Sequence, residues 1–334
     1  MADNTAPFAI SCGDPAGIGP EIIGKSWIAR KEKCLHPFFA VGDISSFAGI
    51  FDGPVIKIHS PNQAADAFSE GLPVLHVQDS GPLTLGSPSM EGAGCALQAL
   101  ELSCGLARSG SAGAVVTGPV SKEQLYKVGF THDGQTEFIS ERCGVARRNA
   151  VMLLAGPSLR VIPMTIHMPM HEVPKHITRN LVISRGRAAH RGMTRNFGIK
   201  EPRLAIAGLN PHAGENGHMG REELDIMIPA LEELRNEGIN ISNPLPADTM
   251  FHKSARSQYD VALCPYHDQA LIPLKTIHFY DGVNMTLGLP IVRTSPDHGT
   301  AFNIAGQNIA NPDSMIAAIQ MAKTAVDHRK VFDA

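Results

Sequence analysis

The sequence predicts an α/β protein built on a mainly parallel sheet. Short apolar runs of about six residues, each closed by Gly or Pro, alternate with longer segments of helical periodicity. Apolar residues make up 43% of the 334 residues and charged residues 18%, which is typical of a globular chain and not of a disordered one. This alternation favours strands that are buried on both faces and joined by helices.

The predicted strands share one design. FAISC (8–12) comes first and ends in a glycine-rich turn, GDPAGIGPE (13–21). The turn residues that close each run indicate where a buried strand leaves the sheet. The other predicted strands cover residues 37–42, 112–119, 149–156, 160–166, 203–211, 260–266 and 289–295.

Three segments between these runs predict helices. Residues 90–108 form a pattern rich in small side chains, and residues 220–236 carry one apolar face that Pro229 is expected to kink. Residues 312–326 repeat the apolar spacing, behind Asn311 as N-cap and a proline at the first helical position. No repeat or low-complexity tether interrupts this order, so two domains, if present, are expected to share an interface.

Composition and charge exclude several classes of protein. The chain has 29 Lys and Arg residues against 32 Asp and Glu residues, and it has no dense basic run. It therefore lacks the positively charged surface that binding to nucleic acid or an anionic membrane requires. No apolar run approaches the roughly 20 residues of a membrane-spanning helix. The first residues lack the basic region of a secretory signal, and the six scattered cysteines indicate reduced, buried thiols. We therefore expect a cytoplasmic protein.

One glycine motif suggests a nucleotide-binding loop. Residues Gly19–Ser26 match the P-loop pattern G-x-x-x-x-G-K-[ST], in which backbone N–H groups point at phosphate oxygens. Pro20 has no N–H, however, and Glu21 would place a carboxylate against the phosphates. The residues favour a helix that starts at Pro20 and contains Lys25, and a P-loop kinase or NTPase stays as the alternative class.

Two further glycine turns give weaker signals. Gly17-Ile18-Gly19 is the start of a dinucleotide fingerprint, with Asp43 as the acid for the ribose, but the third glycine is missing. The turn around Gly118 leads into a helix in which Lys122 faces either an anion or solvent. A tight strand-to-helix turn explains both patterns as well.

Three histidines follow predicted strands: His167 after RVIPMTI, His212 after RLAIAGLNP and His267 after DVALCPY. The carboxyl ends of parallel strands share one sheet edge, where ligands bind. Three imidazoles at this edge suit one divalent metal ion, with coordination positions left open for a substrate. Hydrogen-bonded turn histidines are the alternative.

Cationic and amide side chains stand near the ends of later elements. Lys275, Asn284 and Arg293 are the types that a phosphate or carboxylate clamp requires. Scattered surface charges explain the same residues equally well, so the pattern alone leaves both interpretations open.

Several motifs resemble known families. DHGTAFNIAGQNIANP (297–312) closely resembles the adenosine-side loop of isocitrate and isopropylmalate dehydrogenases. The more specific resemblance, from about residue 8 to residue 326, is to the 4-hydroxythreonine-4-phosphate dehydrogenase family of pyridoxine biosynthesis. It is carried by GDPAGIGPEII, VTGPVSK, GLNPHAGENGHMGREE, LPADTMF, YHDQALIPLK and GVNMTLGLPIVRTSPDHGTA.

The resemblance implies an isocitrate/isopropylmalate dehydrogenase-like fold, with two α/β domains around a central cleft, and a homodimer. Residues 1–125 with 285–334 would form the domain that carries the coenzyme loop, and residues 126–284 the central domain. The family's metal ligands fall on His167, His212 and His267, with one imidazole reaching in from the partner subunit and Zn, Mg or Co as the ion.

The resemblance also implies the substrate and coenzyme contacts. Substrate binding falls on Thr136, Lys275, Asn284 and Arg293, and Gln135 stands where the family usually has histidine. Gln135 can donate a hydrogen bond but cannot titrate. The residues expected to bind NAD or NADP are His298, Gly299, Thr300, Ala301, Asn303 and Asn311.

The implied activity is metal-dependent oxidation of 4-phosphohydroxy-L-threonine with NAD(P), followed by decarboxylation of the β-keto acid. Asp248, Asp268 and Lys275 are the candidate catalytic residues: the two carboxylates would orient ligands or relay the proton, and Lys275 would hold an anionic group. Because Gln135 replaces a histidine, a sugar acid such as D-threonate or D-erythronate 4-phosphate is the alternative substrate. Neither nucleic acid nor membrane is an expected partner.

Overall fold

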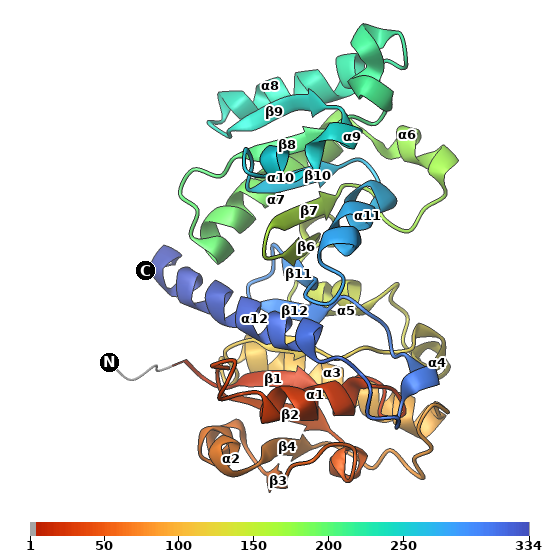
Figure 1. Ribbon diagram of the computed structural model, residues 1–334, viewed down its shortest axis with the longest axis vertical. Helices are drawn as coiled ribbons and strands as arrows, with labels where there is room; N and C mark the ends of the chain where they lie inside the picture. Colours follow the sequence, from red (N-terminus) through yellow and green to blue (C-terminus); the bar gives the residue numbers. More distant parts are fainter. Residues whose placement is uncertain (1–4, 334) are drawn as a thin grey trace. The chain divides into compact units, whose positions relative to one another are not determined.

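The chain folds into two α/β units. A computed structural model describes residues 5–333 (Figure 1). Unit 1 contains the residues up to Arg147 together with Leu289–Val326, and unit 2 contains Arg148–Gly288 and the residues after Val326. The prediction of an α/β protein is therefore confirmed.

The sheet of unit 1 is parallel in every strand pair that the described residues form. Its order is β3-β4-β2-β1-β5-β12. The central strands are fully buried, as expected for apolar runs covered on both faces. The strands are β1 (Phe8–Ser11), β2 (Phe38–Gly42), β3 (Val55–Ile58), β4 (Leu72–His76), β5 (Val115–Thr117) and β12 (Arg293–Pro296).

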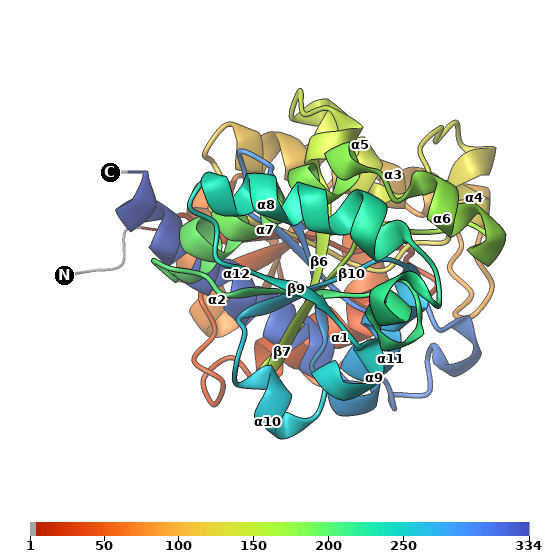
Figure 2. The same ribbon diagram turned by 90° about the horizontal axis from the view of Figure 1, so that it is seen from above.

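Helices cover both faces of this sheet (Figures 1 and 2). One face carries α3 and the other carries α1 and the first part of α12. Asn311 Oδ1 accepts a hydrogen bond from the Asp313 N–H at 2.8 Å, but the last helix begins at Asp313, one residue later than predicted, so Pro312 is the residue before the helix. The helices are α1 (Gly19–Ile28), α2 (Ala64–Glu70), α3 (Met90–Arg108), α4 (Lys122–Lys127), α5 (Gln135–Arg142) and α12 (Asp313–Phe332), and the short 3₁₀ turns are Ile44–Phe47, Pro61–Gln63 and Phe302–Ile304.

The sheet of unit 2 is mixed, with the order β11-β6-β7-β10-β8-β9. Strand β6 runs antiparallel to both of its neighbours, whereas β7, β10, β8 and β9 are parallel. The parallel part is the part that carries the predicted histidines. The strands are β6 (Val151–Gly156), β7 (Leu159–Pro163), β8 (Leu204–Ala207), β9 (Ile241–Leu245), β10 (Val261–Cys264) and β11 (Val283–Leu287).

Helices α7 and α8 lie on one side of this sheet, and α9, α10 and α11 lie on the other (Figure 2). The segment predicted around Pro229 starts as a π-helical turn, Glu223–Met227, and Pro229 stands in the first turn of α8, where a missing N–H is tolerated. The helices are α6 (Val173–His176), α7 (Arg179–Phe197), α8 (Ile228–Asn236), α9 (Ala247–Met250), α10 (Lys253–Arg256) and α11 (His267–Ile277), and the 3₁₀ turns are Arg147–Asn149, Met170–Glu172 and Pro211–Gly217.

The glycine motif near the N-terminus is a turn followed by a helix. Helix α1 starts at Gly19 with Pro20 in its first turn, and Lys25 lies inside the helix. Ser26 Oγ donates to the Ile22 carbonyl at 2.7 Å and is buried. This arrangement is the helix predicted from Pro20 and not a phosphate-binding loop.

Gly13 is the position in this turn that requires glycine most strongly. Its φ is +73°, and a Cβ there would stand 2.2 Å from the Pro119 carbonyl oxygen. Gly110 has a similar φ of +78° with no atom within 4 Å of an added Cβ. Because both positions share the left-handed backbone, we expect Gly13→Ala to destabilise the protein by about 2 kcal/mol or more beyond Gly110→Ala in urea unfolding. Equal losses would show that the turn relaxes around the new methyl group.

The cysteines are all free thiols. Cys12, Cys95, Cys104 and Cys264 are buried as expected, but Cys34 is exposed and Cys143 is half-buried. The prediction of buried thiols is therefore wrong for these two, which lie at chain turns and not in strands. Within residues 5–333, no helix is both long and apolar enough to cross a membrane.

Candidate active site

The three predicted histidines follow one edge of the unit 2 sheet. Strand β10 pairs in parallel with β7 on one side and with β8 on the other. Their carboxyl ends therefore share an edge, and His167, His267 and His212 are the histidines that follow β7, β10 and β8.

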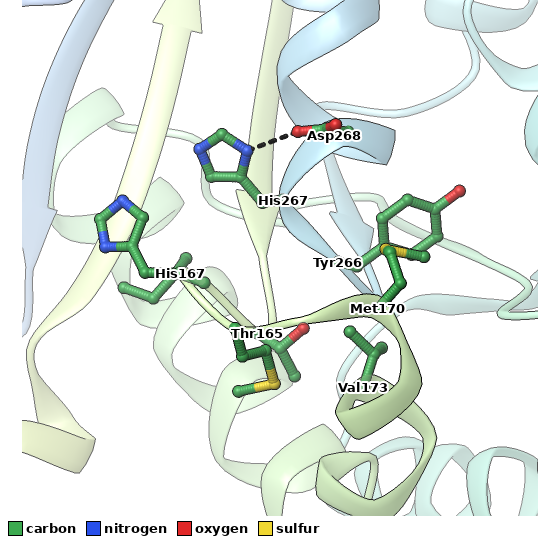
Figure 3. Close-up of a pocket in the computed structure, with 9 residues that line it drawn as sticks. Thr165, His167, Met170, Val173, Tyr266, His267 and Asp268 are labelled. Carbon is green, nitrogen blue, oxygen red and sulfur yellow. Dashed lines mark hydrogen bonds and ion pairs between the residues drawn. The ribbon is translucent and has the colours of Figure 1, made fainter.

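His167 and His267 are neighbours at this edge. Their ring centroids are 5.7 Å apart, and Figure 3 shows the two imidazoles side by side. His167 has a φ of +47°, a conformation that few residues with a Cβ adopt and that surrounding contacts must support. Both histidines line a cavity of about 190 Å³ together with Thr165, Ile166, Met168, Met170, Val173, Tyr266 and Asp268.

Asp268 orients the His267 ring. Its Oδ1 lies 2.7 Å from His267 Nδ1 (Figure 3). A carboxylate at Nδ1 favours the tautomer with the proton on that nitrogen, which leaves Nε2 as an acceptor. His267 is the first residue of α11, and that helix is held on the sheet by the buried side chains of Ala270 and Leu274. The His267 side chain is therefore attached to a helix that is fixed in position.

His212 lies on an unusual left-handed turn. Residues 212–216 all have positive φ, from +43° to +81°, and only Gly214 among them is a glycine. Left-handed backbone costs about 1–2 kcal/mol for each residue with a Cβ, so such a run needs strong external support. His212 Nδ1 lies 3.2 Å from Glu215 Oε2, which leaves its Nε2 available in the same way as that of His267.

The support comes from the start of the next helical segment. Glu223 is buried, and its Oε1 accepts a hydrogen bond from the Asn210 N–H at 2.8 Å. The Asn210 side-chain amide donates to Glu222 at 2.8 Å and to Glu223 at 3.0 Å. These contacts hold the residue that starts the left-handed turn.

A second cavity adjoins His212. Its volume is about 340 Å³, and its lining includes the predicted catalytic residue Asp248 of α9 together with Tyr266 and Gln269. Gln269 donates from Nε2 to the Gly208 carbonyl at 2.8 Å, while its Oε1 is buried without a hydrogen-bond partner among residues 5–333. Sequence reasoning did not select Tyr266 or Gln269. Their position beside His267 in the YHDQ motif is the signal that indicates them.

Lys275 and Asn284 complete the predicted residues of unit 2. Lys275 lies seven residues after Asp268 on α11, about 20° from it around the helix axis, so the two share a helix face. Asn284 is in β11, and its Oδ1 is buried without a partner in the described chain. A buried amide oxygen of this kind is suited to a hydrogen-bond donor on a ligand.

Arg293, Thr136 and Gln135 lie in unit 1. Arg293 is 3% exposed and donates to Thr117 Oγ1 at 2.7 Å and to Thr136 Oγ1 at 3.4 Å. Burial lowers the pKa of Arg293 to about 10, with nearby Glu137 opposing the shift, so the guanidinium is still a cation at neutral pH. Gln135 donates from Nε2 to the Gly118 carbonyl at 3.1 Å, and its Oε1 is a buried acceptor without a partner in the described residues.

The predicted coenzyme residues form one loop of unit 1. His298 is exposed, and its Nδ1 lies 3.0 Å from the Gly299 carbonyl. Ala301 has a φ of +44° at the start of a short 3₁₀ turn. The Ile18 N–H donates to the Thr300 carbonyl at 3.0 Å, so the glycine-rich turn before α1 lies behind this loop.

One cluster in unit 1 is a possible cation site. Among residues 5–333, only Asp43, His76 and Asp79 bring three His, Cys, Asp or Glu ligand atoms within 4.8 Å of one another. The Asp43 carboxylate accepts hydrogen bonds from Ser45 and Ser80, and His76 Nδ1 accepts one from the Ile44 N–H. These contacts account for the positions of Asp43 and His76. The three imidazoles of unit 2 do not converge in this way within one chain.

The sequence and fold agree with a single family. Residues 34–322 match the family model described as pyridoxal phosphate biosynthetic protein PdxA. The chain belongs to the PdxA family. It is 52% identical to a 4-hydroxythreonine-4-phosphate dehydrogenase of Zymomonas mobilis, over 98% of this chain and 97% of that protein. It is also 47% identical to the enzyme of that name from Caulobacter vibrioides, over 97% of this chain and 99% of that protein.

A crystal structure of 4-hydroxythreonine-4-phosphate dehydrogenase from Klebsiella pneumoniae has the same fold, with a TM-score of 0.85 and 34% identity over 96% of this chain and 99% of that one. Membership of the PdxA family confirms the predicted resemblance and the enzyme class, an oxidoreductase of pyridoxal phosphate biosynthesis. The P-loop alternative is not favoured, because α1 starts at Gly19 and the relatives named above are dehydrogenases.

Proposed function

We propose that this protein oxidises 4-phosphohydroxy-L-threonine with NAD(P) and a divalent metal ion. The reaction removes a hydride from C3 and a proton from its hydroxyl group. The C1–C2 bond then breaks and releases CO₂, its electron pair passes toward the C3 ketone, and protonation of C2 gives 3-amino-2-oxopropyl phosphate. The observation that carries the proposal is the pair of imidazoles, His212 and His267, each with Nδ1 beside a carboxylate and Nε2 directed elsewhere, on a PdxA-family chain.

His167, His212 and His267 are the proposed metal ligands. Three imidazole nitrogens suit zinc or cobalt in a site with open positions, whereas magnesium, the other expected ion, prefers oxygen ligands. When bound, the ion would supply Lewis-acid polarisation of the substrate oxygen, and NAD(P) would accept the hydride. The orientation of His267 by Asp268 supports this assignment, because metal-bound histidines need a partner at the second nitrogen.

A homodimer is part of the proposal, with one of the three imidazoles contributed by the partner subunit. Two observations support it. The three rings do not converge within the described part of one chain. The segment from α11 onward also exposes large apolar side chains, with Ile272, Phe279 and Tyr280 each more than 60% exposed. A cytoplasmic location is proposed as well, because six free thiols suit a reducing compartment.

The proton is handled by the charged groups near the histidines. Asp268 holds the His267 ring, and we assign it to orientation of that ring. Asp248 lines the His212 cavity, from where it can accept or relay the hydroxyl proton. Lys275, on the same face of α11 as Asp268, and Asn284 would bind anionic or polar groups of the substrate.

Arg293 and Thr136 are the proposed anion-binding residues of unit 1. Arg293 keeps its positive charge in a buried position and is oriented by two threonine hydroxyls, which suits a phosphate or carboxylate group. Gln135, with its free buried Oε1, offers an acceptor for a donor such as the substrate ammonium. A sugar acid phosphate lacks that ammonium group.

An absorbance assay tests the function. We expect reduced nicotinamide to form, at ~340 nm, with 4-phosphohydroxy-L-threonine and either NAD or NADP, faster than with D-threonate or D-erythronate 4-phosphate. Exhaustive chelation is expected to stop the reaction, and separate additions of Zn, Mg and Co would then identify the metal that restores it. Turnover of the sugar acids alone would assign the alternative substrate class, and full activity after chelation would remove the metal from the proposal.

A further inference from the structure

The segment Gly19–Ser26, which matches the P-loop pattern, makes other contacts in this structure. Lys25 Nζ donates to Glu21 Oε1 at 2.8 Å, to the Asn308 carbonyl at 3.0 Å and to the Ala310 carbonyl at 2.9 Å. An ammonium group has three N–H donors, so these acceptors engage all of them. Lys25 therefore connects helix α1 to the end of the loop that precedes α12.

Glu21 is the buried partner of Lys25, and we call the two residues together the clamp. Glu21 is 1% exposed, and its Oε1 accepts both the Lys25 ammonium and the Ala310 N–H, the latter at 2.9 Å. Because the carboxylate is shielded from water, its charge-assisted hydrogen bonds are stronger than the same bonds on the surface. Residue 310 is thus held through both of its backbone polar groups.

The loop needs such support because its backbone is strained. Ala301 has a φ of +44°, which is unfavourable for alanine, whereas Asn308, at +58°, is of a residue type that adopts this conformation more readily. Left-handed conformations of residues with a Cβ persist only where surrounding contacts impose them. Gly306 and Asn308 also line a cavity of about 100 Å³ together with Asp52, so the clamp shapes a hollow part of the surface.

The other end of the loop is held by the same part of the chain. The Ile18 N–H donates to the Thr300 carbonyl at 3.0 Å, and a Cβ on Gly17 would stand 2.8 Å from that carbonyl. The turn before α1 therefore holds residue 300, while Lys25 and Glu21 hold residues 308 and 310. Three of the six residues predicted to bind the coenzyme, Thr300, Ala301 and Asn303, lie in this stretch, and the other three directly flank it.

We propose that Lys25 and Glu21 are positioning residues for the coenzyme, which hold residues 300–310 in the shape that receives the adenosine half of NAD(P). This inference rests on the proposed function, in which that loop binds the dinucleotide. A loop held in its binding shape before the ligand arrives loses less conformational entropy on binding. The clamp would therefore contribute to coenzyme affinity and not to the chemical step.

The test compares coenzyme affinity with turnover in the full-length protein. Lys25→Met removes the three hydrogen bonds, and Glu21→Gln/Lys25→Met removes both charges, so that no buried carboxylate is left unpaired. Lys127→Met is the matched control, because Lys127 makes the same i,i+4 contact with Glu123, at 3.0 Å, on the surface of α4. Lys25→Arg tests whether a second cation restores the clamp.

Binding of NADH and NADPH is measured by fluorescence titration, and kcat and both KM values by the absorbance assay. We expect Lys25→Met to raise the coenzyme Kd and KM about tenfold or more. We also expect kcat at saturating coenzyme and the substrate KM to stay within about twofold of the parent, and Lys25→Arg to recover part of the affinity.

Three results would overturn the inference. The first is a folded Lys25→Met, or the double variant if the single one does not fold, with the coenzyme Kd of the parent. The second is a fall in kcat with unchanged coenzyme binding, which would assign the pair to the reaction itself. The third is an equal loss of coenzyme affinity in Lys127→Met. A parent protein that binds neither NADH nor NADPH would instead reject the proposed function together with the clamp.

Discussion

Replacing His212 by alanine is expected to lower kcat/KM by about 10³-fold or more, because an imidazole that holds a catalytic metal contributes several kcal/mol to transition-state stabilisation. The side chain is 60% exposed, so the core loses little and the free energy of unfolding should change by less than about 1 kcal/mol. Both quantities are measured on the same preparation, by the absorbance assay and by urea unfolding, together with the bound metal content.

His171→Ala is the control for this prediction. His171 is a more exposed histidine of the same unit, with its Nε2 3.1 Å from Glu172, and it lies outside the two cavities. Its replacement should leave activity and metal content unchanged. If His212→Ala kept its metal and its turnover, His212 would be a turn residue and not a ligand.

Replacing Arg293 by methionine is expected to raise the substrate KM about 100-fold or more, equivalent to ~3 kcal/mol, with a smaller effect on the coenzyme KM. The reason is that a buried, oriented guanidinium binds an anionic group more strongly than an exposed one does. Arg185→Met is a suitable comparison, because burial also lowers the pKa of Arg185 and its guanidinium donates to the Arg148 carbonyl, away from the predicted site residues. A similar KM increase in both variants would indicate a general packing effect.

The same residue predicts a pH dependence. Since the pKa of Arg293 is about 10, the cation is fully present from neutral pH to about pH 9 and is lost as the pH rises through 10. Substrate affinity due to Arg293 should therefore be constant over the lower range and weaken above it. Arg293→Met would abolish that high-pH change, and a parent profile without it would show that the guanidinium stays charged throughout the range.

Much of the fold follows from local sequence. Every predicted apolar run overlaps an observed strand, and the helix predicted at residues 90–108 is α3 with the same bounds. The strands that were not predicted include β3 and β9, which lie at the ends of the two strand orders. Edge strands are only partly buried and tolerate polar residues such as Lys57 and Asn243, so they lack the continuous apolar run that marks a central strand.

The candidate site was predicted less completely than the fold. The sequence motifs indicate the three histidines and the residues of the coenzyme loop, since strand ends and glycine turns are local signals. Gln269 and Tyr266 were not selected, because their place in the YHDQ motif is their only local signal and does not by itself show that they line a cavity. The antiparallel strand β6 was also unexpected, since a short apolar run does not reveal its direction.

By itself, the sequence determined the α/β class, the family and the strands that end in histidine, because burial periodicity and turn chemistry act over a few residues. Only the tertiary structure decided that the rings of His167 and His267 lie side by side, 100 residues apart in the chain, and that Glu223 holds Asn210 at the start of the left-handed turn. It also decided that Lys25 binds the Ala310 carbonyl, 285 residues away in the chain, and not a phosphate. The physical reason is that charge pairing and backbone strain depend on contacts between distant segments, which form only when the two sheets bring those segments together.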